Sequence, residues 1–236
     1  MITCVANKPD WLRTIKVKDC VVFPVEHKDT YLFLLNIHYA KRIPSISYSY
    51  GLFYDGCLIG VITYGTPSSA PLRAGVCGKS NSGKVIELNR LCCFDDAPPN
   101  SESFLVGRSL CLLPKPKIIV SFADTSMNHT GYIYQACNFI YTGLSAKRTD
   151  WKIRGQEHLH GATVADRSRG KPNRALYMRS LYGDDFYLAE RPRKHRYIIF
   201  VGDKRFKKDM LAELRYPVQP YPKNGVGGTP KSISEK

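Results

Sequence analysis

The stretch that decides the fold is Ser121–Gly143, SFADTSMNHTGYIYQACNFIYTG. It starts in an apolar strand that ends at Asp124, and its apolar spacing predicts a short tyrosine-rich helix over residues 131–138. Asn138-Phe139 then leads directly into a second strand-like run, FIYTGLS. Asparagine tolerates the left-handed conformation in which many helices end, so Asn138 is predicted to terminate the helix. The stretch therefore predicts strand, helix and strand in quick succession.

Upstream, residues 26–41 have the polar-then-apolar pattern of a helix that ends near Lys41. Two β-rich runs then flank Asp55-Gly56, a strong hairpin signal because such tight turns need positive φ. Residues 66–84 are predicted to be a loop. They include GKSNSGK, but Val85 stands where a phosphate-binding loop needs Ser or Thr, and a strand follows rather than a helix. This departure argues against an NTPase.

The remaining elements alternate between apolar strands and amphipathic helices. Pro98-Pro99 ends one strand, and Asn100 or Ser101 is predicted to cap the next helix. The region from Thr149 to Arg193 is predicted to be irregular, with one helical piece at 173–183. The predicted strands are 84–94, 116–124, 139–145 and 195–202, and the predicted helices are 102–113 and 204–215. This order is that of an α+β fold with a mixed, mostly antiparallel central sheet flanked by helices.

The length of 236 residues suits one core that carries an insertion. We predict a single domain over residues 1–220, including a basic insertion at 149–194. The tail, residues 221–236, is rich in Pro, Gly and Ser and is predicted to be disordered.

The net charge of +15 is unevenly distributed. Residues 1–146 hold 14 Lys/Arg against 10 Asp/Glu, whereas residues 147–223 hold 19 against 9. Such a basic segment is typical of proteins that bind phosphate polyanions. A basic flap with a purely structural role is the alternative. The predicted DNA contacts are Lys152, Arg154, Arg167, Arg169, Lys171, Arg174 and Arg179.

Several classes are disfavoured. No apolar run approaches the roughly 20 residues of a bilayer span, and the first residues lack the apolar core of a signal peptide, so a cytoplasmic protein is expected. The eight cysteines lack metal-site spacing and are expected to be reduced. His158-x-His160 beside Glu157 could be half of a metal site, but no clear third ligand is nearby.

The order of elements, with Tyr134 four residues before Asn138-Phe139, resembles the GNAT acyltransferase superfamily. Five stretches in order, NIHYAKR, YGLFYDGCLIGVITYG, VIELNRLCCFDDAPPNSES, IIVSFADTS and KHRYIIFVGDKRFKK, are similar to the phage Mom family of DNA adenine-modifying proteins. That resemblance implies a transferase that acts on adenine N6 of double-stranded DNA in the host cytoplasm and protects phage DNA from host restriction. No membrane partner is expected, because the sequence lacks an apolar span, and the oligomeric state stays open.

The resemblance also implies an active site in a gap between the fourth and fifth strands. It carries over His38, Tyr39, Arg90, Asp124 and Tyr134, and Glu87 joins them from the same ELNR strand segment. Asp124 would act as base or orienter, Tyr134 as acid and Arg90 as anion stabiliser. Glu87 and Arg90 share a sheet face only if a bulge intervenes. The structural alternatives are an Arg90–Asp124 ion pair and simple packing of the other side chains.

The implied donor is acetyl-CoA or a related acyl-CoA, and the family also suggests iron. GNAT enzymes hold the diphosphate on a Gly-rich loop, but this chain has DDAPPNS there, with two prolines and two aspartates. The expected cofactor contacts are the N–H groups of Ser101, Glu102 and Ser103, together with Asn128. The rival functions are a GNAT N-acetyltransferase that acts on a protein or small amine, and a non-catalytic DNA-binding protein.

Overall fold

The computed structural model describes residues 10–159 and 161–222. Most of the tail predicted to be disordered, and His160 of the possible metal site, lie outside the described residues. Within the described ranges, no helix is long and apolar enough to cross a membrane.

A seven-stranded sheet forms the body of the molecule, in the order β1-β2-β3-β4-β5-β9-β6. Every neighbouring pair is antiparallel except β4 and β5, which are parallel. The predicted α+β class with a mixed, mostly antiparallel sheet is therefore confirmed. The strands are β1 Val21–Pro24, β2 Tyr48–Tyr54, β3 Cys57–Gly65, β4 Val85–Cys93, β5 Lys117–Asp124, β6 Ile140–Leu144 and β9 Lys194–Val201.

Helices cover both faces of this sheet. On one face, α2 (Ser101–Leu112) and α3 (Tyr132–Ala136) pack against Ile119 and its neighbours. On the other face, α1 (Ala70–Cys77) and α6 (Lys204–Ala212) pack against Ile118 and Val120. The alternating faces of β5 thus enter two different hydrophobic clusters, as expected of a central strand.

Two predictions in the N-terminal half need correction. The helix expected over 26–41 is present but ends earlier: the chain is helical without a break from His27 to Ile37, with 3₁₀ residues at His27–Thr30 and a π-helical segment at Phe33–Ile37, and it is extended at His38. The expected loop over 66–84 contains α1 and a 3₁₀ helix, Lys79–Lys84. The Leu72 N–H donates to the Ser69 hydroxyl at 3.2 Å, so α1 begins with a side-chain cap.

The sequence predicts an asparagine at two helix boundaries: Asn138 at the end of α3, and Asn100 (or Ser101) at the start of α2. Asn138 has a φ of 58°, and the buried Phe139 follows it, so the predicted left-handed termination is confirmed. Asn100 is the N-cap residue of α2, as predicted, but the expected side-chain capping bond is absent. Asn100 is itself left-handed, and the Ser101 hydroxyl donates to the Pro98 carbonyl at 2.7 Å.

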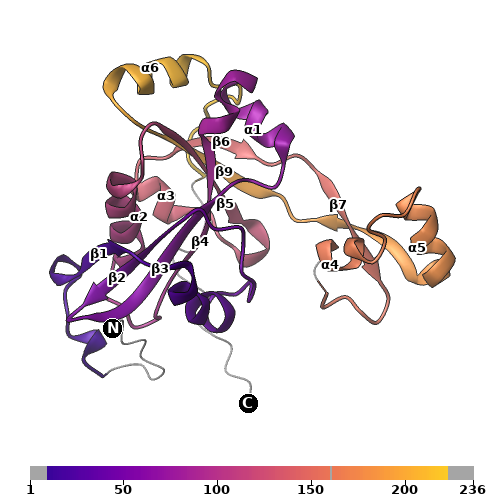
Figure 1. Cartoon of the computed structure of the whole chain (residues 1–236), viewed down its shortest axis with the longest axis horizontal. Coiled ribbons are helices and arrows are strands. Elements are labelled where there is room, and N and C mark those ends of the chain that lie inside the picture. The colour runs from indigo at the N-terminus through magenta and orange to yellow at the C-terminus, as the bar shows by residue number, and fades with distance from the viewer. Residues whose placement is uncertain (1–9, 160, 223–236) are drawn as a thin grey trace.

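The insertion between β6 and β9 is ordered, so the prediction of an irregular region is wrong, although the one helical piece predicted at 173–183 is confirmed. Its strands β7 (Arg148–Ile153) and β8 (Phe186–Arg191) form a separate antiparallel ribbon, which carries α4 (Gly161–Asp166) and α5 (Arg174–Tyr182). We call residues 148–191 the arm. Figure 1 shows the arm projecting away from the central sheet. It has a small core of its own, made of Ile153, Val164, Met178 and Phe186.

Candidate active site

The two parallel strands of the sheet diverge after one short paired segment. β4 and β5 pair only between Val85–Leu88 and Ile118–Ser121; beyond that, β4 stays with β3 and β5 stays with β9. A cavity of about 1380 Å³ lies here and is lined from both strands, from α2 and α3, and from the root of the arm. The predicted gap between the two strands is therefore present.

A bulge in β4 places Glu87 and Arg90 on the same side. Thr63 pairs with Arg90 and Tyr64 pairs with Leu88, which leaves Asn89 as the extra residue. The Asn89 amide is held on both sides: its Oδ1 accepts from the Thr63 hydroxyl at 2.6 Å, and its Nδ2 donates to the Ser45 carbonyl at 2.8 Å. Glu87 and Arg90 both line the cavity as a result.

Arg90 presents an unused hydrogen-bond donor. Its Nη1 donates to the Asn89 carbonyl at 2.6 Å, whereas its Nε is buried without a partner among the described residues. Burial lowers the pKa of Arg90, against the opposing effects of Tyr39 and Glu87. A buried guanidinium N–H that lacks an acceptor is suited to an oxygen that becomes negative during a reaction.

Glu87 and Tyr134 line the same cavity with complementary proton affinities. Burial raises the pKa of Glu87, although Arg90, Lys194 and Arg191 oppose the shift. Burial also raises the pKa of Tyr134 to about 12, with the Ser121 hydroxyl opposing it. At neutral pH Tyr134 is thus a proton donor, and Glu87 is a carboxylate with more affinity for a proton than a solvated one.

His38 is a neutral hydrogen-bond donor in this structure. Its side chain is buried, and its Nδ1 accepts from the Ala40 N–H at 3.0 Å. Burial lowers its pKa to about 4, and Arg90 and His129 add to the effect. The neutral ring carries one proton, and because Nδ1 accepts, that proton lies on Nε2.

Tyr39 and His129 form an aromatic wall with His38. The rings of His38 and Tyr39 are stacked at 4.5 Å, and the ring of His129 meets Tyr39 edge-on at 6.2 Å. All three residues line the cavity, and Tyr39 is 50% exposed. The sequence reasoning missed His129; its only signal was its position just after the strand that ends at Asp124.

Asp124 lies beside the cavity, and both of its carboxylate oxygens have bonding partners. Its Oδ2 is 2.7 Å from the Lys194 ammonium, and its Oδ1 accepts from the Ser126 N–H and hydroxyl at 3.0 and 2.7 Å. Burial alone would raise the pKa of Asp124, but the Lys194 and Ser126 hydrogen bonds outweigh it and lower the pKa. The alternative of an Arg90–Asp124 ion pair is wrong, because Lys194 is the partner. Of the two, only Lys194 lines the cavity.

The end of the cavity near α2 carries negative charge. Asp95, Glu102 and Ser103 line it, and burial raises the pKa of Glu102, with Asp95 adding to the effect. The Ser101 N–H donates to the Pro98 carbonyl at 3.1 Å, so the expectation that it is free is wrong. Asn128 ends a 3₁₀ turn and does not line the cavity, unlike His129 next to it. This end does not fit the diphosphate of coenzyme A.

Two of the predicted DNA contacts hold the arm together. The Lys152 ammonium donates to the carbonyls of Glu157 and Leu159 at 2.7 and 2.9 Å. Arg174 donates to the Ser168 hydroxyl at 3.0 Å and lies over the ring of Trp151. Both cations therefore have a structural role in the arm.

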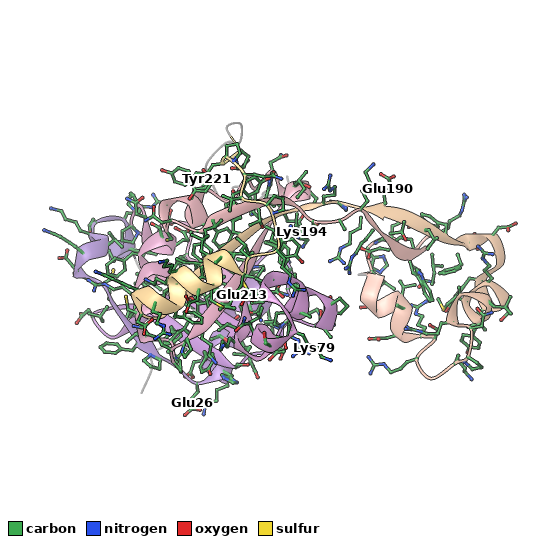
Figure 2. The ribbon with its side chains drawn as sticks, turned by 90° about the horizontal axis from the view of Figure 1, so that it is seen from above. Glu26, Lys79, Glu190, Lys194, Glu213 and Tyr221 are labelled. Carbon is green, nitrogen blue, oxygen red and sulfur yellow. The ribbon has the colours of Figure 1, made fainter. Side chains whose placement is uncertain are left out.

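The other predicted DNA contacts are exposed on the arm: Arg154, Arg167, Arg169, Lys171 and Arg179. Three of them make local contacts that leave them at the surface. Arg167 donates to the Tyr182 hydroxyl at 3.0 Å, Arg169 pairs with Asp166 at 2.8 Å, and Lys171 lies over the ring of Tyr177. Besides Lys41, Arg90 and Arg196, the cations that line the cavity are Arg148, Arg191 and Lys194 at the root of the arm, and Arg148 and Lys194 had no predicted role. Figure 2 shows Lys194 at this root, with Glu190 farther out.

The described residues offer no ligand set for iron. Over 10–159 and 161–222, no three His, Cys, Asp or Glu side chains gather as a metal site. His158 is exposed on the arm.

Comparisons with known proteins place this geometry in context. The model of the Mom protein family matches residues 19–223. The chain is 34% identical over 194 residues to the methylcarbamoylase mom of Escherichia phage Mu, covering 79% of this chain and 76% of that protein. Among solved structures, an N-acetyltransferase from Staphylococcus aureus Mu50 matches 77% of this chain and 98% of its own, with 12% identity and a TM-score of 0.41. A GNAT family acetyltransferase from Elizabethkingia anophelis with acetyl-CoA bound matches the same shares, with 11% identity and a TM-score of 0.39.

Proposed function

The chain belongs to the Mom protein family, and from this premise we propose that it is a transferase that modifies adenine N6 in double-stranded DNA. The proposed product carries a methylcarbamoyl or carbamoylmethyl-type group, in line with the name of the phage Mu relative, a methylcarbamoylase. Such a product would protect phage DNA from restriction in the host cytoplasm. The observation that carries the proposal is the single cavity shared by Glu87, Arg90 and Tyr134, with cations at its arm side.

Adenine N6 is a poor nucleophile because its lone pair is delocalised into the ring. A catalyst must position the amine, remove a proton and stabilise developing negative charge. In our proposal Glu87 accepts the proton from N6, and the free Nε of Arg90 donates to the oxygen of the transferred group. Tyr134 protonates the leaving group, and His38 Nε2 donates a further hydrogen bond.

Asp124 takes the orienting role in this scheme. Its two oxygens are occupied by Lys194 and Ser126, and its pKa is lowered, so it has little tendency to accept a proton. It fixes the Lys194 ammonium at the cavity wall. Lys194 then favours the ionised form of Glu87.

None of these steps assigns a residue to binding the donor of the transferred group. An acyl-CoA is what the family resemblance implies, but Asp95 and Glu102 would repel its diphosphate, and the Ser101 N–H is already used. Iron likewise lacks a ligand set among the described residues. The proposed chemistry therefore relies on this chain's own groups for binding, proton transfer and charge stabilisation.

The DNA is proposed to present its target base outside the stack. In a duplex, N6 is committed to pairing, and enzymes that act on a base edge extrude the nucleotide into a pocket at a cost of a few kcal/mol. The exposed cations of the arm would bind backbone phosphates on either side. Arg148 and Arg191 belong to the arm and also line the cavity, so the two proposed contact regions for the DNA adjoin each other.

The direct test is to co-express the protein with a plasmid in a bacterial host, digest the plasmid to nucleosides and search for a heavier deoxyadenosine by mass spectrometry. We expect the new nucleoside with the wild type and with Glu190→Gln, an exposed control on β8, and its loss with Glu87→Gln. Unmodified deoxyadenosine from the wild type would contradict the proposal. DNA binding without modification would instead support the non-catalytic alternative.

A further inference from the structure

The cavity contains an aromatic surface and a pair of arginines for which the proposed chemistry has no use. We propose that the extrahelical adenine stacks on Tyr39, and that Arg148 and Arg191 hold the phosphates next to it. This proposal rests on the proposed function and specifies how its substrate is seated.

Tyr39 is built as a platform. The π-helical segment ends at Ile37, and His38, fixed by the Ala40 N–H, packs its ring on Tyr39 at an interplanar angle of 27°. Tyr39 nevertheless remains half exposed on the cavity. An aromatic ring that is supported from behind and open in front is the surface on which proteins stack unpaired bases.

His129 defines the side of this seat. Its backbone N–H donates to the Asp124 carbonyl at 3.2 Å, so the end of β5 determines where it lies. Its ring stands at 85° to that of Tyr39. A planar base that stacks on Tyr39 would therefore meet the perpendicular His129 ring, which limits how far the base can slide.

Arg148 and Arg191 are directly opposite each other in the β7–β8 ladder. Like charges in such cross-strand positions repel each other and destabilise the pairing. Asp150 offers only partial compensation, since its carboxylate lies 4.0 Å from Arg191. Both arginines line the cavity, so an anion between them would relieve the repulsion.

The charges also define the orientation of the nucleotide. The arm side of the cavity carries Arg148, Arg191 and Lys194, whereas the α2 side carries Asp95 and Glu102. Phosphates are attracted to the first side and repelled from the second. The nucleotide therefore enters from the arm, with its base directed towards Tyr39 and Glu87.

A duplex with one bulged adenine, compared with the same duplex fully paired, tests this seat by fluorescence anisotropy. We expect the wild type to prefer the bulged duplex, Tyr39→Ala to reduce that preference about tenfold, and Tyr39→Phe to keep it. Tyr31→Ala removes a partly exposed tyrosine outside the cavity lining and should have no effect. The double variant Arg148→Ala/Arg191→Ala should weaken binding to both duplexes and reduce the slope of log K against log salt by about 2.

Thermal unfolding checks that each variant is folded. An equal affinity of the wild type for both duplexes, or an unchanged preference in Tyr39→Ala, would overturn the stacking role. An unchanged salt slope in the double variant would overturn the phosphate role. Plasmid modification by the wild type separates these results from the proposed function: it can persist when the seat is wrong, and a Tyr39-dependent preference can persist when no modified base forms.

Discussion

The cavity and the arm place their charges in opposite environments. In the cavity, Glu87 and Arg90 are partly buried and have shifted pKa values, and the nearby Asp124 is paired. On the arm, Arg167, Arg169 and Lys171 stand at the surface beside polar and aromatic neighbours. Under the proposed function, the cavity would determine the rate of the reaction and the arm would determine the affinity for DNA. Substitutions in the two regions should therefore have separable effects.

The largest effect is expected from Glu87→Gln. Loss of a general base typically costs about 10²–10⁴-fold in rate, while DNA affinity should stay within twofold because the arm is unchanged. In the proposed mechanism Glu87 acts in its deprotonated form. Because its pKa is raised, the wild-type rate should fall as pH drops through that raised pKa. Rates can be measured as modified deoxyadenosine formed in clarified host lysate, which supplies the donor.

A Glu87→Gln protein that retains the rate and the acid limb of the pH profile would remove Glu87 from the base role. Glu190→Gln is the matched control, since Glu190 is exposed on the arm and away from the cavity lining. It should leave both rate and pH profile unchanged.

The next effect is on affinity. Replacing Arg167, Arg169 and Lys171 with Ala should weaken DNA binding and lower the salt slope by about 2–3, since each lost phosphate contact contributes about 0.9. At saturating DNA the modification rate should be unchanged. The control removes three lysines from the body, Lys204, Lys207 and Lys208 on or next to the exposed surface of α6. Equal slopes for the two triple variants would show that the arm is not the DNA interface.

The body of the protein could be predicted largely because its signals are local. The apolar runs indicated strands that are buried on both faces. Asp55, Gly56 and Asn138 all adopt the expected positive φ. The cavity was partly predictable for the same reason. A bulge was the stated condition for Glu87 and Arg90 to share a face, and Asn89 provides it.

What was missed depends on contacts between distant parts of the chain. Lys194 meets Asp124 through the register of β5 with β9, about 70 residues apart, and no local pattern indicates that register. Likewise, no local pattern in the sequence indicates that β7 and β8 of the arm pair with each other. α1 is different: Ser69 and Pro71 are ordinary helix-start residues, and the Gly, Ser and Pro content around them concealed the signal.

A smaller effect is expected when a partly buried ion pair is compared with an exposed one. Asp124→Asn should cost about 2 kcal/mol of unfolding free energy at pH 7, since its carboxylate accepts three hydrogen bonds, one of them from Lys194. The folded-state pKa lies below the usual 3.8, so this stabilisation is present above about pH 4 and is lost as pH falls through the folded-state pKa. Urea unfolding at pH 7 and pH 3 measures both.

The matched arm variant is Asp166→Asn, which breaks the exposed pair with Arg169 and should cost less than about 0.5 kcal/mol. A cost for Asp124→Asn that is equally small at pH 7, or that stays the same at pH 3, would show that the Lys194 pair contributes little to the body.

The last comparison concerns two asparagines with positive φ, one in each region. Asn138 (φ 58°) ends α3 in the body, and Asn173 (φ 47°) precedes α5 in the arm. Replacing either with Ala should cost about 1 kcal/mol, because a side chain with a Cβ and no local hydrogen-bonding group is strained there.

Asn138→Ala should lower the melting temperature of the whole body, since Phe139 is buried next to it. The arm has its own core, so Asn173→Ala should speed hydrogen exchange in α5 and leave the body's melting temperature unchanged. Glycine at either position should restore stability, and a shift in the body's melting temperature from Asn173→Ala would mean that the arm and body unfold as one unit.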